Sequence, residues 1–269
     1  MLRLRNVGLR HSLFALALIL GISAMLPFSQ AHANIIGADD RTHPPKVEGT
    51  LLESIGILKS VPDDGGWGTA FVVGNGCYIM TAYHVAFPMR NGVRPQPSAN
   101  VISEFHVMQN ERHFSFKRKY TARPFRWGHM GLDWAILQLE NCRPGDLHRL
   151  LVQTPGVGAT IEEPLTPVGF PQDRAHEAGM MLQKHCTTRL PGDTITFAYT
   201  DCDSAGGMSG APVIVRRQLR ADSSQLTNVV VGMILGSHQI APQGRTTDFS
   251  RDFGTVIMHM DPVMPWINH

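Results

Sequence analysis

The sequence predicts an all-β protein, folded as barrels or as a sandwich, and three observations support this. Short apolar or alternating runs rich in Val, Ile, Phe and Thr recur along the chain of 269 residues. Clusters of Gly, Pro, Asn and Asp separate these runs, as turns separate strands. Long stretches with a helical period are absent after Ala33. Many short strands between turns favour barrels or a sandwich over alternating β/α units.

The apolar runs place the expected strands. We expect them at residues 54–58, 69–73, 78–81, 135–139, 194–197, 211–215, 229–235 and 254–258. The proline-rich segments 95–97 and 164–171 are expected to be loops, and the second is expected to connect two halves of the fold. We expect a polar loop over residues 239–251 and a short helical turn near residues 262–268.

The segment that ends at Ala33 has the three-part layout of a secretory signal peptide. Arg3, Arg5 and Arg10 form a basic start, an apolar run follows at residues 13–26, and Ala31-His32-Ala33 forms a small-x-small end. The apolar run is shorter than the ~20 residues that a membrane-spanning helix needs, which disfavours an uncleaved anchor. We therefore expect cleavage after Ala33, a secreted or periplasmic protein, and no stable membrane anchor after cleavage.

Charge and cysteine content narrow the function classes. Signal removal changes the formal net charge from +2 to −1, because the segment up to Ala33 holds three arginines and no acid. A nearly neutral chain gives no electrostatic reason to expect a nucleic acid partner. The four cysteines predict two disulfides in an exported chain, with three connectivities open. They are Cys77, Cys142, Cys186 and Cys202. Neither a C-x-x-C pair nor an H-E-x-x-H motif occurs, so we expect no metal and no cofactor.

The strongest chemical signal is a serine between glycines, in G-G-M-S-G at residues 206–210. Glycines on both sides of Ser209 allow a tight turn that exposes the hydroxyl. The N–H groups of Gly207 and Ser209 would then form an oxyanion hole, in which each donor stabilises the transition state by about 3–4 kcal/mol. The alternative is an ordinary glycine-rich turn.

Two further segments supply a base and a carboxylate. His84 follows the strand expected at residues 78–81, and at the strand end it can take a proton from a neighbouring serine. Asp133 precedes the apolar strand at residues 135–139, where a carboxylate needs a partner such as the second imidazole nitrogen of His84. Taken singly, each has an alternative: a structural histidine, or a solvated turn aspartate.

The order of the three residues favours catalysis. His84, Asp133 and Ser209 follow one another along the chain in one of the three known triad orders. An α/β-hydrolase would carry its serine first, on a turn between a strand and a helix. Here the serine segment runs into a strand, and Ala211 stands where that turn needs glycine. We therefore predict Ser209 as nucleophile, His84 as general base and Asp133 as the group that orients His84.

These segments resemble the active-site motifs of chymotrypsin-like serine proteases. The motifs are T-A-Y-H-V at residues 81–85, L-D-W-A-I-L at 132–137 and G-M-S-G-A-P at 207–212. N-I-I-G-A-D-D-R at 34–41 and D-C-D-S-A-G-G-M-S-G at 201–210 resemble the bacterial trypsin-like and glutamyl-endopeptidase group. The resemblance implies one protease domain over residues 34–269, an exported endopeptidase that acts on polypeptides, most simply as a monomer.

The resemblance also implies an architecture. Two perpendicular six-stranded antiparallel β-barrels, at about residues 50–150 and 160–260, would enclose the active site between them, followed by a short C-terminal helix. In this fold the expected disulfides are Cys77–Cys142, at the ends of the strands that carry His84 and Asp133, and Cys186–Cys202, which would brace the wall leading to Ser209.

Substrate preference depends on residues that the same resemblance places near Ser209. Asp203 would lie at the base of the primary specificity pocket, where a carboxylate favours Arg or Lys in the substrate; alternatively it is a structural feature of the bacterial group. The wall that pairs with the substrate backbone would include Ile234, Gly236 and Ser237. Ile234 stands where glutamyl endopeptidases have a histidine, which argues against a preference for glutamate.

Two departures from the family pattern affect the expected activity. Met208 replaces the aspartate that captures the new amino terminus when animal zymogens are activated, so we expect no such activation. Leu235 replaces a serine that usually supports the triad aspartate, which would lower activity. Two alternatives to an endopeptidase therefore stay open: a weak or inactive binding protein of the same fold, and an esterase for small acyl substrates.

Overall fold

The computed structural model describes most of the chain after the expected signal peptide. The described residues are 33–44, 53–62, 66–89, 92–98, 100–108, 116–128, 132–152, 161–174, 179–192, 196–218, 226–237, 246–250 and 254–267. The expected apolar signal segment lies outside these ranges, as do most of the loop expected at 239–251 and half of the strand expected at 194–197. None of the helices within these ranges is long and apolar enough to cross a membrane.

Six strands close the first barrel. They are β2 (Ile55–Val61), β3 (Gly68–Val73), β4 (Tyr78–Thr81), β5 (Ile102–Met108), β6 (Phe116–Trp127) and β7 (Ala135–Leu139). Their pairing order is β2-β3-β4-β7-β6-β5, and every pair is antiparallel. The strand β3 is buried along its whole length, which explains its nearly continuous apolar sequence.

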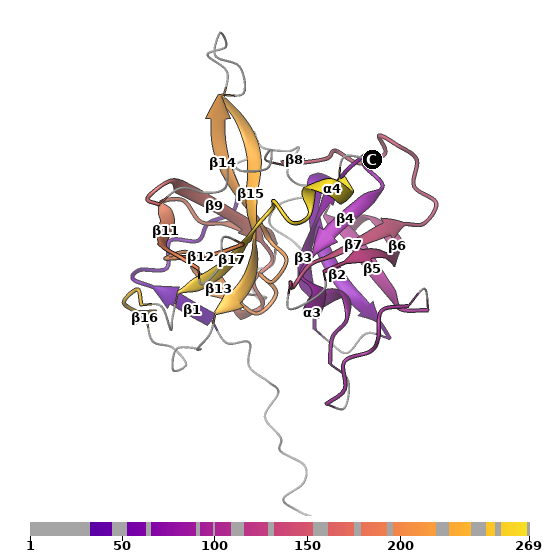
Figure 1. The fold of residues 1–269 in the computed structure, drawn as a ribbon, viewed down its shortest axis with the longest axis horizontal. Coiled ribbons are helices and arrows are strands. Elements are labelled where there is room, and N and C mark those ends of the chain that lie inside the picture. The colour runs from indigo at the N-terminus through magenta and orange to yellow at the C-terminus, as the bar shows by residue number, and fades with distance from the viewer. Residues whose placement is uncertain are drawn as a thin grey trace, which may run out of the picture. The chain divides into compact units, whose positions relative to one another are not determined.

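A second ring of six antiparallel strands forms the other barrel. They are β9 (Pro164–Gly169), β11 (Cys186–Pro191), β12 (Phe197–Thr200), β17 (Thr255–His259), β15 (Leu226–Ser237) and β14 (Pro212–Gln218), in pairing order. The pairing of β14 with β9 closes this ring. The short strands β8 (Leu151–Val152) and β10 (Met181–Leu182) extend it. Figure 1 shows the two barrels as separate bodies, with the β14–β15 hairpin projecting from the second.

Three short elements lie around the second barrel and between the two. A small sheet joins β1 (Ala33–Ile36) to β13 (Ser204–Ala205) and β16 (Thr246–Thr247). A 3-10 helix, η2 (Gln172–Arg174), follows β9. The C-terminal helix α4 (Met264–Ile267) follows β17 of the second barrel and returns to the first, as Figure 1 shows.

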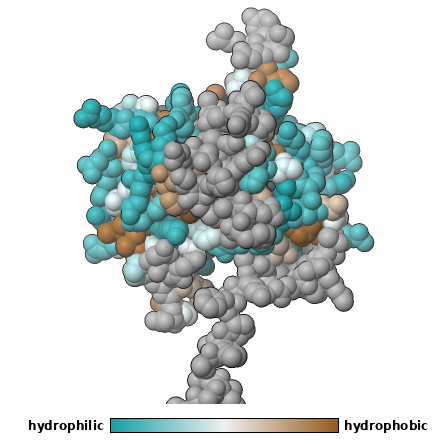
Figure 2. Space-filling view, turned by 180° about the vertical axis from the view of Figure 1, so that it is seen from behind, coloured by the Kyte–Doolittle hydropathy of each residue, from teal (hydrophilic) through white to brown (hydrophobic). Residues whose placement is uncertain are grey.

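One apolar cluster joins the two barrels. It includes Phe71 and Met80 of the first barrel, Val168 and Met233 of the second, and Ile267 of α4. Burial of a large apolar side chain stabilises a fold by about 1.5–3 kcal/mol, so this shared cluster makes the barrels one cooperative unit. The described surface in Figure 2 is mostly hydrophilic, and its hydrophobic residues form small separate patches.

The expected all-β double barrel with a short C-terminal helix is confirmed, and so are the strand bounds 78–81 and 135–139. The loop expected at 164–171 was wrong, because residues 164–169 form β9. The two prolines of β9 led to this error. Pro164 occupies the first strand position, where a missing N–H matters least. Leu165 and Val168 of the same strand are fully buried. Of the two described residues of the strand expected at 194–197, only Phe197 lies in a strand, β12 (Phe197–Thr200), and Thr196 lies in a turn.

Both disulfides expected from the resemblance are present. Cys77 joins Cys142, and Cys186 joins Cys202. The first bridge links the loop before β4 to the turn after β7, and the second links the start of β11 to the segment that leads to Ser209. Two disulfides are consistent with an extracellular or periplasmic location, where thiols oxidise and bridges persist.

Candidate active site

His84 lies on a one-turn helix, α3 (Tyr83–Ala86), directly after β4. Thr81, the last residue of β4, donates from its hydroxyl to the Thr69 carbonyl of β3 at 2.7 Å and so fixes the end of the strand. Ala82 is fully buried beneath the turn. The side chain of His84 itself is 31% exposed, so the imidazole stands on a rigid base and is accessible to a substrate.

Asp133 holds His84 by two hydrogen bonds. The backbone N–H of His84 donates to Asp133 Oδ1 at 2.9 Å, and His84 Nδ1 lies 2.6 Å from Asp133 Oδ2. Burial alone would raise the pKa of Asp133, but the hydrogen bonds and charge of His84 lower it below the ordinary value. An ionised carboxylate only accepts, so Nδ1 carries the hydrogen and Nε2 is left as the acceptor.

The backbone around Ser209 adopts a turn that only glycine allows at two positions. Gly207 and Gly210 have φ angles of 87° and 85°. A Cβ atom at Gly207 would lie 2.3 Å from the Phe170 carbonyl oxygen, and one at Gly210 would lie 2.1 Å from the Thr69 carbonyl oxygen. The two glycines around the nucleophile are therefore required both by backbone conformation and by space.

Thr69 attaches this turn to the first barrel. Its backbone N–H donates to the Ser209 carbonyl at 2.9 Å, and its hydroxyl donates to the Gly207 carbonyl at 2.7 Å. Among the hydrogen bonds of the described residues, none uses the N–H groups of Gly207 or Ser209. Within the described part of the chain these two N–H groups are therefore unused, and the oxyanion hole expected at Gly207 and Ser209 stays a prediction.

Ser209 and His84 line the same pocket, which has a volume of about 260 Å³. Its other lining residues include Trp67, Gln172 and Gly206. The Ser209 hydroxyl donates to the Leu235 carbonyl of β15 at 3.2 Å. Within the described part of the chain, no hydrogen bond joins Ser209 to His84.

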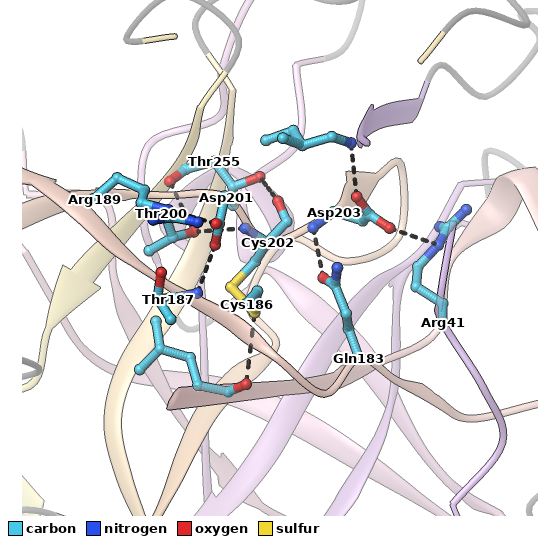
Figure 3. The surroundings of a disulfide bond; sticks show 12 residues. Arg41, Gln183, Cys186, Thr187, Arg189, Thr200, Asp201, Cys202, Asp203 and Thr255 are labelled. Atoms are coloured by element: carbon cyan, nitrogen blue, oxygen red, sulfur yellow. Dashed lines mark hydrogen bonds and ion pairs between the residues drawn. A yellow bond between two sulfur atoms is a disulfide. The ribbon is translucent and has the colours of Figure 1, made fainter. Parts of the chain in front are cut away.

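The residues expected to set specificity lie apart from this pocket. Asp203 is fully buried, and its Oδ1 accepts a hydrogen bond of 2.8 Å from the backbone N–H of Ile36 (Figure 3). Burial raises the pKa of Asp203 to about 7. The hydrogen bond from Ile36 and the charge of Arg41 lower this pKa, but by less than burial raises it. Ser237 Oγ lies 2.9 Å from Ser204 Oγ, and Ile234 is fully buried. The charge-pairing role of Asp203 therefore stays a prediction.

Sequence reasoning missed residues that contact the segments around the site. Thr69 bonds to Gly207, Trp67 to Phe170 and Arg41 to Asp173, and each partner is distant in sequence. A weak signal existed for Thr69, because a hydroxyl in the fully buried strand β3 needs a hydrogen-bond partner. No group of His, Cys, Asp and Glu among the described residues is arranged to hold a metal ion.

The comparisons with known proteins agree with this geometry. The profile of the trypsin-like peptidase domain matches residues 68–220, which hold His84, Asp133 and Ser209. The chain belongs to the trypsin-like peptidase family. No curated protein sequence matches it significantly.

Solved structures of serine proteases share the fold of this trypsin-like peptidase. A Glu endopeptidase in complex with MPD has a TM-score of 0.56 and 13% identity, over 84% of this chain and 93% of that chain. A serine endoprotease from Yersinia pestis has a TM-score of 0.52 and 13% identity, over 83% of this chain and 66% of that chain. At such low identity the likeness concerns the fold.

Replacing Gly210 by alanine tests whether the turn of this trypsin-like peptidase depends on glycine. The added Cβ would clash with the Thr69 carbonyl, so we expect Gly210→Ala to lower the free energy of unfolding by about 3 kcal/mol or more. Gly145 is the matched control, because its φ is 88° and nothing lies within 4 Å of a Cβ there. Gly145→Ala should cost only about 1–2 kcal/mol. Urea unfolding would measure both, and equal losses would contradict the steric argument.

Proposed function

We propose that the chain is an exported serine endopeptidase, which hydrolyses peptide bonds through an acyl-enzyme on Ser209. The observation that carries this proposal is the His84–Asp133 pair, whose imidazole lines the same pocket as Ser209. The pair leaves His84 Nε2 free to accept a proton. The trypsin-like peptidase family supports polypeptides as substrates.

The proposed reaction starts when the Ser209 hydroxyl leaves the Leu235 carbonyl and turns toward His84. This movement exchanges one hydrogen bond for another, at a cost of about 1 kcal/mol at most. As Ser209 Oγ attacks the substrate carbonyl carbon, His84 Nε2 takes its proton, and Asp133 stabilises the imidazolium that forms. The N–H groups of Gly207 and Ser209 stabilise the oxyanion.

Three proton transfers complete the cycle. His84 gives its proton to the leaving amine, the C–N bond breaks, and the acyl group stays on Ser209 as an ester. Water then loses a proton to His84 and attacks this ester, and collapse of the second tetrahedral intermediate returns the hydroxyl to Ser209 with its proton. This cycle is supported by the shared pocket of Ser209, Gly207 and His84, and by the bonds of Asp133 to His84.

The alternative is a protease-fold protein that binds but does not cleave. One observation favours it: the Ser209 hydroxyl is bonded to Leu235 and not to His84. We favour the enzyme because catalytic hydrogen bonds in unliganded sites often form only in the substrate complex. The bonds between Asp133 and His84 and the conformation of the glycine turn around Ser209 support this choice.

Labelling with a fluorophosphonate separates the two functions. An activated serine forms a covalent phosphonyl ester, so we expect mass spectrometry to find the label on Ser209 in the intact protein. Ser209→Ala should abolish both labelling and peptide cleavage. Ser103→Ala is the control, because this buried serine of β5 has no hydrogen-bond partner for its hydroxyl in the described part of the chain. An unlabelled wild-type protein, with cleavage unaffected by Ser209→Ala, would refute the proposal.

Asp133→Asn tests the tautomer argument. The asparagine amide can donate to Nδ1, which would move the imidazole hydrogen to Nε2 and remove the base. We expect kcat to fall by about 10⁴-fold, with the fold intact by circular dichroism. Asp146 offers a matched control, since it accepts a backbone hydrogen bond from Arg143 in a surface turn. If Asp146→Asn lowered kcat as much as Asp133→Asn, the role of Asp133 would be general stability and not catalysis.

A further inference from the structure

A cluster of charges around the buried Arg41 attaches the amino-terminal segment to the second barrel. The Arg41 side chain is only 2% exposed. Its guanidinium donates to both oxygens of Asp39, at 2.9 and 2.8 Å, and to both oxygens of Asp173, at 3.1 and 2.7 Å. Arg174 adds a bond of 2.6 Å to Asp39. Bidentate pairs of this kind are strong and also fix the orientation of the two side chains.

Asp203 is the third carboxyl group of this cluster. Its Oδ2 lies 4.0 Å from Arg41 Nε and has no hydrogen-bond partner among the described residues, while Oδ1 binds the Ile36 N–H (Figure 3). The backbone N–H of Asp203 donates to Gln183 Oε1 at 2.6 Å. The cluster therefore holds two guanidinium groups against three carboxyl groups, and Asp203 faces the amino-terminal segment.

The cluster reaches the turn that carries Ser209 from one side through η2. Arg41 binds Asp173 of this 3-10 helix, and the backbone N–H of the preceding residue, Gln172, donates to the Gly206 carbonyl at 2.7 Å. The Gln172 side chain donates to the Trp67 carbonyl at 3.0 Å. The position of Gly206, at the start of the turn, thus depends on a helix that Arg41 holds.

A second connection reaches the same turn through β1. Asn34 pairs with Ser204, and Ala33 pairs with Ala205, in the antiparallel ladder between β1 and β13. The Ala205 carbonyl then accepts the Met208 N–H at 3.0 Å. Further along the segment, Thr42 exchanges two hydrogen bonds of 2.8 Å with Leu182. The amino-terminal segment therefore contacts both elements that bond to the catalytic turn, η2 and β13.

We propose that residues 33–43 are a positioning element for the catalytic turn at residues 206–210, and that Arg41 is the positioning residue that anchors them. This inference rests on the proposed function of Ser209. An aspartate before the serine would fix the catalytic turn through an ion pair. Met208 stands at that position and cannot form the pair, so the proposal assigns this task to the buried Arg41. Arg41 does not touch the reacting atoms and acts through Asp173 and Asp203.

Arg41→Met tests the proposal, because methionine keeps the apolar volume and removes every donor. We expect the fluorophosphonate labelling rate of Ser209 to fall at least tenfold, and amide hydrogen exchange to accelerate in peptides that cover residues 206–210. Arg217→Met is the matched control: Arg217 also forms a bidentate pair, with Glu163, but on the β14 strand away from the turn. Its labelling rate should stay within twofold of the wild type.

The outcomes separate the two proposals. One outcome would overturn the positioning role alone. In it the wild type is labelled, the labelling rate of Arg41→Met stays within twofold of the wild type, and amide exchange at residues 206–210 is no faster than in Arg217→Met. An unlabelled wild type would overturn the proposed function, and faster turn exchange in Arg41→Met would then still support positioning. If Arg41→Met does not fold, Asp173→Asn removes only the link to η2 and should slow labelling at least threefold.

The pH dependence of stability tests the place of Asp203. The charged groups that face it are Arg41, Asp39 and Asp40, all from the amino-terminal segment. Its pKa is about 7 in the folded chain and 3.8 when unperturbed, so the stability it contributes is complete below about pH 4 and is lost as the pH rises to 7. Asp203→Asn stays neutral, so its urea midpoint should move upward relative to the wild type between pH 4 and 8.

Two results would contradict this assignment. A constant difference between the urea midpoints of Asp203→Asn and the wild type would mean that the carboxyl does not take up a proton in the fold. A wild-type preference for Arg or Lys in a peptide library, lost in Asp203→Asn, would mean that the carboxyl contacts the substrate and not the amino-terminal segment.

Discussion

Thr69 makes the hydrogen bonds on which the rest of the candidate site depends. Its N–H and hydroxyl bind the carbonyls of Ser209 and Gly207, its hydroxyl also accepts from Phe170, and its carbonyl accepts from Thr81. All of these groups are buried, where an unpaired donor or acceptor costs about 1–3 kcal/mol. A single threonine in β3 thus aligns the strand before His84 with the turn that carries Ser209. The close approach of these backbones explains why Gly207 and Gly210 have no space for a side chain.

Two aspartates show how surroundings decide the charge of the same side chain. Asp133 and Asp203 both lose hydration, and burial favours the neutral form of each. Asp133 receives two hydrogen bonds from His84, so its pKa falls and the carboxylate stays charged. Burial raises the pKa of Asp203, because its one backbone hydrogen bond and Arg41, which it shares with two other carboxylates, lower that pKa less than burial raises it. The first environment suits a group that stabilises an imidazolium, and the second suits a structural contact.

Proximity among the three candidate residues was easier to predict from the sequence than the contacts that surround them, for a physical reason. His84, Asp133 and Ser209 stand beside strands whose apolar patterns are strong, so motif and order sufficed to predict that they lie close together. The strand β6 was missed because its exposed end is rich in Lys and Arg, and β9 was missed because of its prolines. Arg41 and Asp173 are far apart in the sequence, and nothing local in either segment indicates the partner. Such contacts exist only once the barrels have formed.

The apolar cluster between the barrels also sets a condition on how the protein assembles. Ile55 of β2 and Ile267 of α4 belong to the same cluster, so residues from both ends of the described chain complete one core. Contacts between such distant residues require a large loop to close before they contribute any stability, and they slow folding. A growing chain that lacks α4 cannot finish the packing behind β3, the strand that holds Ser209 in place. The surroundings of Ser209 are therefore complete only after α4 has packed into this cluster.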